Sequence, residues 1–267
     1  MERILDDHGP SCVAHSSHFP PPMSTTPRES PPLGRLLTRR EVLALIGVSG
    51  AALFTRTASA LAQTRGAPAS CVVRPQQTEG PFFVDEGLER SDIRPDPKTG
   101  EVRPGVPLRL AFRVSRLSAT SCAPLAGAQV DVWHCDAEGR YSDVGGFGSR
   151  ASTAAGRFLR GYQRTDAAGG AQFLTIYPGW YGGRAVHVHF KIRTVDAGRQ
   201  YAFTSQLYFD DAFSERVFAV EPYASRGRRW LRNADDGIFR EGGKELLLAP
   251  TPEAKGYAAT FDVALTM

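Results

Sequence analysis

The sequence has 267 residues, of which 32 are Lys or Arg and 28 are Asp or Glu, and its formal net charge is +4. This charge is too small to indicate a nucleic-acid partner or attraction to a membrane surface. We interpret the densest basic cluster as a solvated face; it consists of Arg226, Arg228, Arg229 and Arg232.

The first 62 residues have the composition of a leader rather than that of a folded domain. Residues 1–32 are rich in Pro, Ser and His and show no apolar period, so they are either disordered or lie upstream of the true start, for which Met23 is an alternative to Met1. Arg39 and Arg40 then precede an uncharged apolar run, and small residues follow as far as Ala62. The run has about 13 residues, whereas a membrane-spanning helix needs about 20. We therefore expect no stable membrane anchor. We expect a twin-arginine signal that is cleaved after Ala62 and exports the protein to the periplasm or the medium.

Residues 63–267 are sufficient for a single domain with a substantial core. They include three cysteines, Cys71, Cys122 and Cys135, so at most one internal disulfide can form. Cys122 and Cys135 are poor partners because the segment between them reads as an extended strand. About eight extended residues would separate its ends by about 26 Å, whereas bridged Cα atoms lie about 5.5 Å apart. Any disulfide should therefore include Cys71, and the sequence leaves its partner open.

Short stretches of alternating apolar and polar residues, separated by turns, follow a turn-rich segment at residues 63–105. The expected strands cover residues 108–114, 128–133, 158–162, 173–176, 186–192 and 206–209, and the best helix candidate covers residues 213–220. Turn sequences at residues 136–139 and 166–170 separate some of these strands. The pattern predicts an all-β fold, an antiparallel β-sandwich with long loops and little helix.

Three histidines follow the leader, and two of them form a His-x-His pair, His187 and His189. Residues i and i+2 of a strand share a face, with Cβ atoms about 7 Å apart, so both imidazoles can reach one metal ion. Such a pair also occurs as ordinary surface or core histidines, and the spacing alone does not decide between the two interpretations.

Two tyrosines lie where they could complete a metal site. Tyr181 precedes His187 by six residues, with Gly182 and Gly183 allowing the chain to fold back, and Tyr141 follows the turn at residues 136–139. Phenolate oxygen and imidazole nitrogen together suit a hard trivalent iron, whereas zinc sites use Cys, His and carboxylate ligands. Each tyrosine considered alone could equally be a sheet aromatic.

Four segments together resemble a known family. Residues 177–190 contain the pattern P-G-x-Y followed by R-x-x-H-x-H, and residues 132–142 contain Tyr141. Residues 206–209 and 77–83 supply the other two segments. These motifs resemble those of the intradiol ring-cleavage dioxygenases, a family that includes catechol 1,2-dioxygenase and protocatechuate 3,4-dioxygenase.

The resemblance implies a mononuclear non-haem enzyme with one Fe(3+) per chain that cleaves a catechol between its two hydroxylated carbons. O2 would be the second substrate and a cis,cis-muconate-type diacid the product. The implied iron ligands are Tyr141, Tyr181, His187 and His189. The implied catalytic residues are Arg184, as a positive charge beside the substrate, and Tyr181, as the ligand that leaves and accepts a proton. The implied substrate-binding residues are Glu79, Gly80, Pro81, Gln206 and Tyr208. His134 has no ligand role in this scheme and is expected to neighbour the site.

Two alternatives compete with this interpretation. Residues 124–130, 165–169 and 178–181 also resemble the transthyretin-like sandwich modules of exported proteins, which are binding or structural modules without catalysis. An exported hydrolase with another metal is the second alternative, but the expected carboxylate ligand and nucleophile motif are lacking. No counterpart of the helical dimerisation domain of catechol 1,2-dioxygenases is recognisable, so the oligomeric state stays open, as does the identity of the catechol.

Overall fold

The structure is a computed structural model that describes residues 71–144, 152–153, 156–227 and 231–267. The predicted leader, Arg228 and Arg229 lie outside the described residues. The described residues belong to one compact unit, Thr64–Met267. Within them, no helix has both the length and the apolar character needed to cross a membrane.

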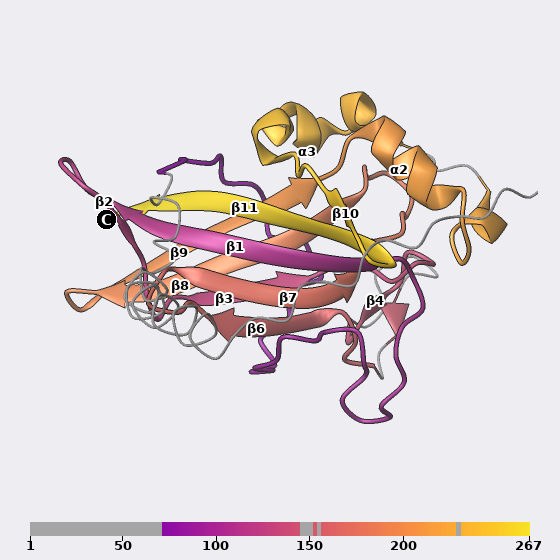
Figure 1. Cartoon of the computed structure of the whole chain (residues 1–267), viewed down its shortest axis with the longest axis horizontal. Helices are drawn as coiled ribbons and strands as arrows, with labels where there is room; N and C mark the ends of the chain where they lie inside the picture. The colour runs from indigo at the N-terminus through magenta and orange to yellow at the C-terminus, as the bar shows by residue number, and fades with distance from the viewer. Residues whose placement is uncertain (1–70, 145–151, 154–155, 228–230) are drawn as a thin grey trace, which may run out of the picture. The chain divides into compact units, whose positions relative to one another are not determined.

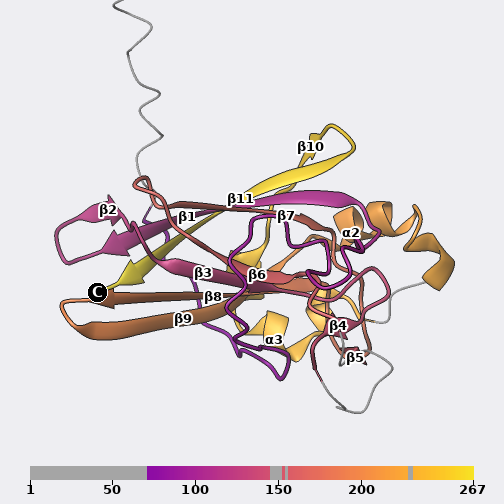
Figure 2. The same ribbon diagram turned by 90° about the horizontal axis from the view of Figure 1, so that it is seen from below.

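Two β-sheets are stacked as two layers (Figures 1 and 2). In the described part of the chain, the first sheet has the order β10-β11-β1-β2, with β7 also paired to β1. Its strands are β1 (Pro107–Leu117), β2 (Cys122–Pro124), β7 (Gly170–Ile176), β10 (Thr251–Glu253) and β11 (Gly256–Thr266). The second sheet has the order β6-β3-β8-β9. Its strands are β3 (Gln129–Trp133), β6 (Arg160–Arg164), β8 (His187–Asp196) and β9 (Arg199–Tyr208). A small parallel pair joins β4 (Tyr141–Ser142) to β5 (Ser152–Thr153).

The core lies between the two sheets and follows from the alternation of side chains along the strands. Phe112 of β1 and Phe190 of β8 are buried and face each other, with ring centroids 5.3 Å apart. Phe261 of β11 contacts both rings, at 6.2 and 5.5 Å. The predicted sandwich is therefore confirmed. The stacked sheets are not entirely antiparallel, because β1 and β11 run parallel, from Leu108 beside Tyr257 to Leu117 beside Thr266.

Some element boundaries differ from those predicted. The expected helix is present as α2 (Asp211–Phe218), two residues earlier than predicted, because the side chain of Asp210 accepts a hydrogen bond from Phe213 N and begins the helix there. Strand β6 begins two residues later than predicted. The short helical segments η1 (Ala224–Arg226), η2 (Asn233–Asp235), α3 (Gly237–Arg240) and η3 (Gly243–Leu246) follow α2.

Strand β3 is more deeply buried than its alternating sequence predicts. Residues 130–133 are all buried, because the segment before β1 covers the outer face of the strand as well. The ring of Phe83 from this segment packs against Trp133 with centroids 4.8 Å apart. Asp131 is paired with Arg193 at 2.9 Å.

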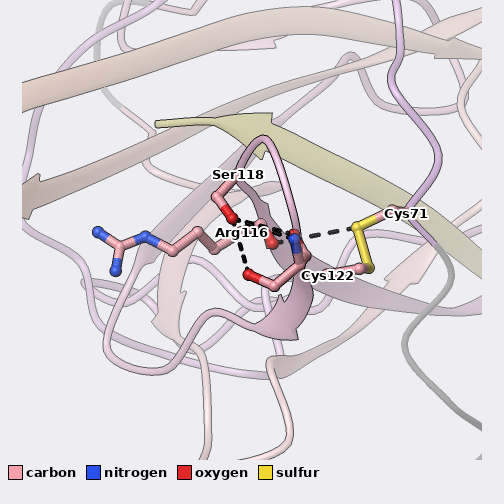
Figure 3. The surroundings of a disulfide bond; sticks show 5 residues. Cys71, Arg116, Ser118 and Cys122 are labelled. Carbon is pink, nitrogen blue, oxygen red and sulfur yellow. Dashed lines mark hydrogen bonds between the residues drawn. A yellow bond between two sulfur atoms is a disulfide. The ribbon is translucent and has the colours of Figure 1, made fainter.

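A disulfide joins Cys71 to Cys122, with Cα atoms 5.8 Å apart (Figure 3). The expectation that any disulfide includes Cys71 is confirmed, and Cys135 is a free, buried thiol. The disulfide holds the start of the described chain beside the first sheet. There Ala264 N of β11 donates to Val72 O at 2.8 Å.

Candidate active site

The two histidines of β8 lie side by side on the face of the second sheet that points away from the core. Both imidazoles are buried, and their Nε2 atoms are 3.0 Å apart. Val188, between them in sequence, points into the core, as the alternation predicts. Because His187 and His189 are two residues apart on one strand, their Nε2 atoms face the same point.

Two loops bring the tyrosine side chains to the same point. Tyr181, on the loop after β7, places its hydroxyl 3.1 Å from His187 Nε2. Tyr141, in β4, places its hydroxyl 3.4 Å from the same nitrogen. Tyr141 is fully buried, whereas Tyr181 is only partly buried. The structure therefore brings together all four of the predicted iron ligands.

Aromatic neighbours fix the orientation of the donor rings. The ring of Trp133 is stacked on that of His189, with centroids 5.0 Å apart and an interplanar angle of 7°. The two residues are direct partners in the β3–β8 register. Phe82 is stacked on Tyr141 at 4.2 Å. Neither Trp133 nor Phe82 was predicted as a site residue from the sequence, although pairing β3 with β8 in this register would have identified the tryptophan.

Burial sets the protonation of the four donors. Burial lowers the pKa of His187 to about 3, with a further contribution from the positive charge of Arg184. Burial and the neighbouring His187 hold the pKa of His189 well below its ordinary value. Burial raises the pKa of Tyr181 to about 12 against the opposing effect of Arg184, and it raises the pKa of Tyr141 well above its ordinary value. The imidazoles are thus neutral, and the phenols need a nearby cation to ionise.

The four donors fit a metal ion in both geometry and chemistry. His187 Nδ1 is 2.6 Å from Ala185 O and donates to it, which leaves the Nε2 lone pair directed at the other donors. Two ligands about 2.0–2.1 Å from a shared ion lie about 2.9–3.4 Å apart at angles between 90° and 109°. The separations of 3.0, 3.1 and 3.4 Å from His187 Nε2 fall in this range. Two oxygen and two nitrogen donors suit ferric iron.

An ordinary zinc site is not a good alternative for these residues. Among the residues that the structure describes, no group of three or more His, Cys, Asp or Glu side chains is placed to hold a metal ion. His134 binds elsewhere, as expected for a neighbour without a ligand role. Its Nε2 lies 2.6 Å from Thr175 Oγ1 and its Nδ1 lies 2.8 Å from Cys135 O.

Arg184 lies next to the four donors at the centre of a polar network. Its Nη2 donates to Gln206 Oε1 at 2.5 Å and contacts the hydroxyl of Tyr208 at 3.4 Å. Gln206 Nε2 donates to Thr78 O at 2.9 Å, and the hydroxyl of Tyr208 donates to Gln77 Oε1 at 2.8 Å. Three of the predicted site residues, Arg184, Gln206 and Tyr208, are therefore in direct contact.

The segment around Gly80 approaches the donors from the other side. A Cβ atom at Gly80 would lie 3.4 Å from His189 Cε1, and the φ of +70° at this position favours glycine. Pro81 lies next to it in an exposed turn. The carboxylate of Glu79 is bound by Lys191 Nζ at 2.7 Å, so this predicted substrate-binding residue already has a partner on β8.

Asp236 contacts the site but was not singled out from the sequence. Its carboxylate pairs with Arg184 Nε at 3.0 Å and accepts from Ala185 N at 2.8 Å, while it also caps α3 by accepting from Ile238 N. The Asp-Gly sequence at residues 236–237 could have indicated a helix start. Nothing local in the sequence indicates that this carboxylate reaches Arg184, 52 residues earlier.

The basic cluster near the C-terminus is not simply a solvated face, and this prediction is wrong for Arg226. The guanidinium of Arg226 lies over the ring of Trp180, 4.1 Å from its centroid, and donates to two backbone carbonyls. Arg232 is exposed and paired with Glu215, as a solvated residue would be.

Comparison with known proteins connects this site to a family. Residues 78–225, more than half of the chain, match the family model described as Dioxygenase (Dioxygenase_C). The chain belongs to the intradiol ring-cleavage dioxygenase family. All four donors and Arg184 lie within the matched range, whereas Asp236 and Arg226 lie outside it.

Individual relatives agree with this family assignment. Catechol 1,2-dioxygenase 1 from Acinetobacter lwoffii is 29% identical over an alignment of 183 residues that covers 57% of this chain and 54% of that protein. The chain thus spans about half the length of this curated relative. The intradiol ring-cleavage dioxygenase from Tetranychus urticae is 30% identical with a TM-score of 0.63, covering 73% of this chain and 95% of that one. The dioxygenase domain of a dioxygenase–carbohydrate-binding protein fusion from Streptomyces sp. SirexAA-E is 30% identical with a TM-score of 0.52, covering 73% and 99%.

Proposed function

We propose that this chain is an iron(III)-dependent dioxygenase that cleaves a catechol ring between its two hydroxylated carbons. O2 supplies both added oxygen atoms, and the product is a cis,cis-muconate-type diacid. The observation that carries the proposal is the convergence of two phenols and an imidazole on His187 Nε2, all within 3.4 Å. A transthyretin-like binding module has no use for this set of donors with a buried arginine beside it.

Each residue of the site has a distinct part in this proposal. Bound ferric iron would supply a Lewis acid for both catechol oxygens, which would make the ring reactive towards O2. Tyr181, the less buried of the two tyrosines, would be the donor that gives way to substrate, and its oxygen would accept a catechol proton. Tyr141, buried beneath Phe82, stays in place. Arg184 holds a positive charge where negative charge develops on the substrate.

The proposal is tested by isolating the protein and measuring metal, colour and oxygen uptake together. We expect one iron per chain and a wine-red colour, because charge transfer from tyrosinate to iron(III) absorbs visible light. Oxygen uptake should match the amount of catechol consumed, and a panel of catechols, protocatechuate and hydroxyquinol would identify the substrate. A colourless protein with stoichiometric zinc, or one that takes up no oxygen with any catechol, would contradict the proposal.

Export through the twin-arginine route is a separate proposal that rests on Arg39, Arg40 and the apolar run after them. The Cys71–Cys122 disulfide supports it, because such bonds persist in oxidising compartments. Replacing both arginines by lysine should leave the precursor in the cytoplasm, as cell fractionation would measure. Unchanged export of that variant would mean that the leader has another role.

A further inference from the structure

The two phenol donors are carried by two loops, and their spacing depends on how these loops pack together. One loop, residues 136–140, leads from the turn after β3 to Tyr141, and the other, residues 177–180, leads from β7 to Tyr181. Gly179 N donates to Asp136 O at 3.1 Å, so the loops meet backbone to backbone. A Cβ atom at Gly179 would lie 2.5 Å from Asp136 O, and one at Gly139 would collide with Trp180 O. The histidines, in contrast, are held together by one strand.

A single side chain bridges the two loops. Arg226 Nη1 donates to Ala137 O at 2.9 Å, and Nη2 donates to Trp180 O at 2.9 Å. Ala137 lies four residues before Tyr141, and Trp180 directly precedes Tyr181. The same guanidinium is stacked on the Trp180 ring at 4.1 Å. One rigid group is therefore bonded to both tyrosine-bearing loops at once.

We propose that Arg226 is a positioning residue that fixes the distance between the Tyr141 and Tyr181 phenols by clamping the two loops together. The effect of this clamp on metal binding rests on the proposed function, since the phenol spacing matters most if both oxygens bind one iron. The clamp itself is a property of the chain and can be tested without metal.

The segment that carries Arg226 is itself anchored to the fold, which gives the clamp a fixed base. The hydroxyl of Tyr223 donates to Tyr177 O at 2.6 Å and accepts from Val106 N at 3.1 Å. Arg226 N in turn donates to Tyr223 O at 3.1 Å. Tyr223 is fully buried, so the short helical segment η1 cannot move without breaking these contacts.

The geometry requires a guanidinium rather than any positive charge. Arginine presents several N–H donors in one rigid plane and can bond two carbonyls on different loops while it stacks on an aromatic ring. Lysine has a single ammonium on a flexible stem and would lose the two-point contact. Arg226→Lys should therefore lose the contact with two carbonyls, as Arg226→Gln does.

The first test measures hydrogen exchange of the metal-free full chain. In Arg226→Gln, amide exchange should become about tenfold faster or more in both loops, residues 136–140 and 177–180, and in the tyrosine that follows each loop. This factor corresponds to about 1.4 kcal/mol. Arg226→Lys, which keeps the charge, should loosen at least one loop. This variant replaces Arg226→Gln in the test if the glutamine variant does not fold. Arg232→Gln, a surface arginine from the same cluster, should leave both loops unchanged. Val263→Ala, a buried change in β11, should lower the melting temperature without selective exchange in the loops.

The second test measures the iron-loaded chain without substrate. In Arg226→Gln, the visible tyrosinate band should weaken or shift, and iron should be lost to a chelator about tenfold faster, in line with the same loosening. Val263→Ala should keep the wild-type band. The clamp is refuted if Arg226→Gln exchanges like wild type in either loop, or if Val263→Ala reproduces its band shift. If wild type binds no iron, the proposed function fails while the exchange data still decide the clamp.

Discussion

Arg184 shows how the site fixes the orientation of a charged side chain before any substrate arrives. Its guanidinium contacts a carboxylate from Asp236, an amide from Gln206 and a hydroxyl from Tyr208, all supplied by other segments. A charge fixed in this way needs no reorganisation during the reaction, which is the condition for effective electrostatic stabilisation. Arg184 is held by protein groups alone, whereas His187 and His189 would bind the proposed metal through their Nε2 atoms.

Substitutions at Arg184 and His189 should therefore have different effects. Arg184→Ala should keep iron and colour but lower kcat by about 10²–10³-fold, or about 2.7–4 kcal/mol, as is typical for the loss of one preorganised electrostatic group. His189→Ala should lose most of its iron, and Tyr181→Phe should keep iron but turn over slowly. Steady-state kinetics combined with iron analysis would distinguish the three variants. Our assignment of roles would be wrong if Arg184→Ala lost iron as completely as His189→Ala.

Asp236→Asn should weaken catalysis without removing the metal. Asparagine still caps α3, but it exchanges the carboxylate that pairs with Arg184 for a neutral amide. Hydrogen bonds to charged groups contribute about 1.5–3 kcal/mol, so kcat should fall by about 10–100-fold, less than in Arg184→Ala. Iron content should equal that of wild type. A kcat equal to that of wild type would show that Gln206 and Tyr208 alone are enough to orient Arg184.

Strand β8 combines two functions on its two faces. Val188, Phe190 and Ile192 are buried in the core, while the opposite face presents the donors and then Lys191 and Arg193. Lys191 binds Glu79, and Arg193 binds Asp85 at 2.5 Å, so the strand holding the histidines also holds the segment that covers them. The segment that covers the histidines, residues 79–85, is thus attached to β8 by two ion pairs.

Lys191→Met should loosen this attachment with little effect on the chemical step. The Lys191–Glu79 pair is partly exposed, and such pairs contribute up to about 1 kcal/mol, so KM should rise by up to about fivefold while kcat stays near the wild-type value. Lys191→Arg, which retains the charge, should behave more like wild type. Raising the ionic strength should increase the KM of wild type more than that of Lys191→Met, which keeps only the Arg193–Asp85 pair. A fall in kcat with unchanged KM would contradict this role.

The elements that could be predicted from sequence are those with a regular repeat. The alternation around His187 and His189 predicts both the strand and its two faces, and the Asp-x-x-Gly turns predict the chain reversals at residues 136–139 and 166–170. The contacts of Asp236 and Arg226 could not be predicted, because they join segments about 40–90 residues apart in the chain through a single side chain. The covering of β3 by Phe83 was missed for the same reason: it depends on tertiary packing and leaves no local pattern.

At the scale of the whole molecule, covalent and hydrogen-bonded links tie the start of the described chain to its end. The disulfide closes a loop between residues separated by 51 positions, and Val72 accepts a hydrogen bond from Ala264. The four proposed iron ligands lie on β4, on β8 and on the loop after β7, and none of them belongs to this link. Stability and metal binding should therefore be separable.

Replacing both Cys71 and Cys122 by serine should lower the free energy of unfolding by up to about 4 kcal/mol, the chain-entropy effect of opening a loop of this length. Well below the melting temperature, iron content and kcat should stay at wild-type values. Chemical denaturation with and without a reducing agent would measure the change, and reduction should have no further effect on the double variant. Loss of iron from the folded double variant would show that the link also shapes the site.

The parallel pairing of β1 with β11 has a consequence for the order of events during synthesis. Phe112 and its neighbours on β1 cannot be fully covered until residues 256–266 have left the ribosome, because these last residues supply the adjacent strand. Contacts between segments so far apart in the chain make folding slow and leave apolar surface exposed meanwhile. A nascent chain halted before Gly256 would remain open and prone to aggregation. A protein that folds in this way is suited to transport after folding is complete. The proposed twin-arginine leader would provide such transport.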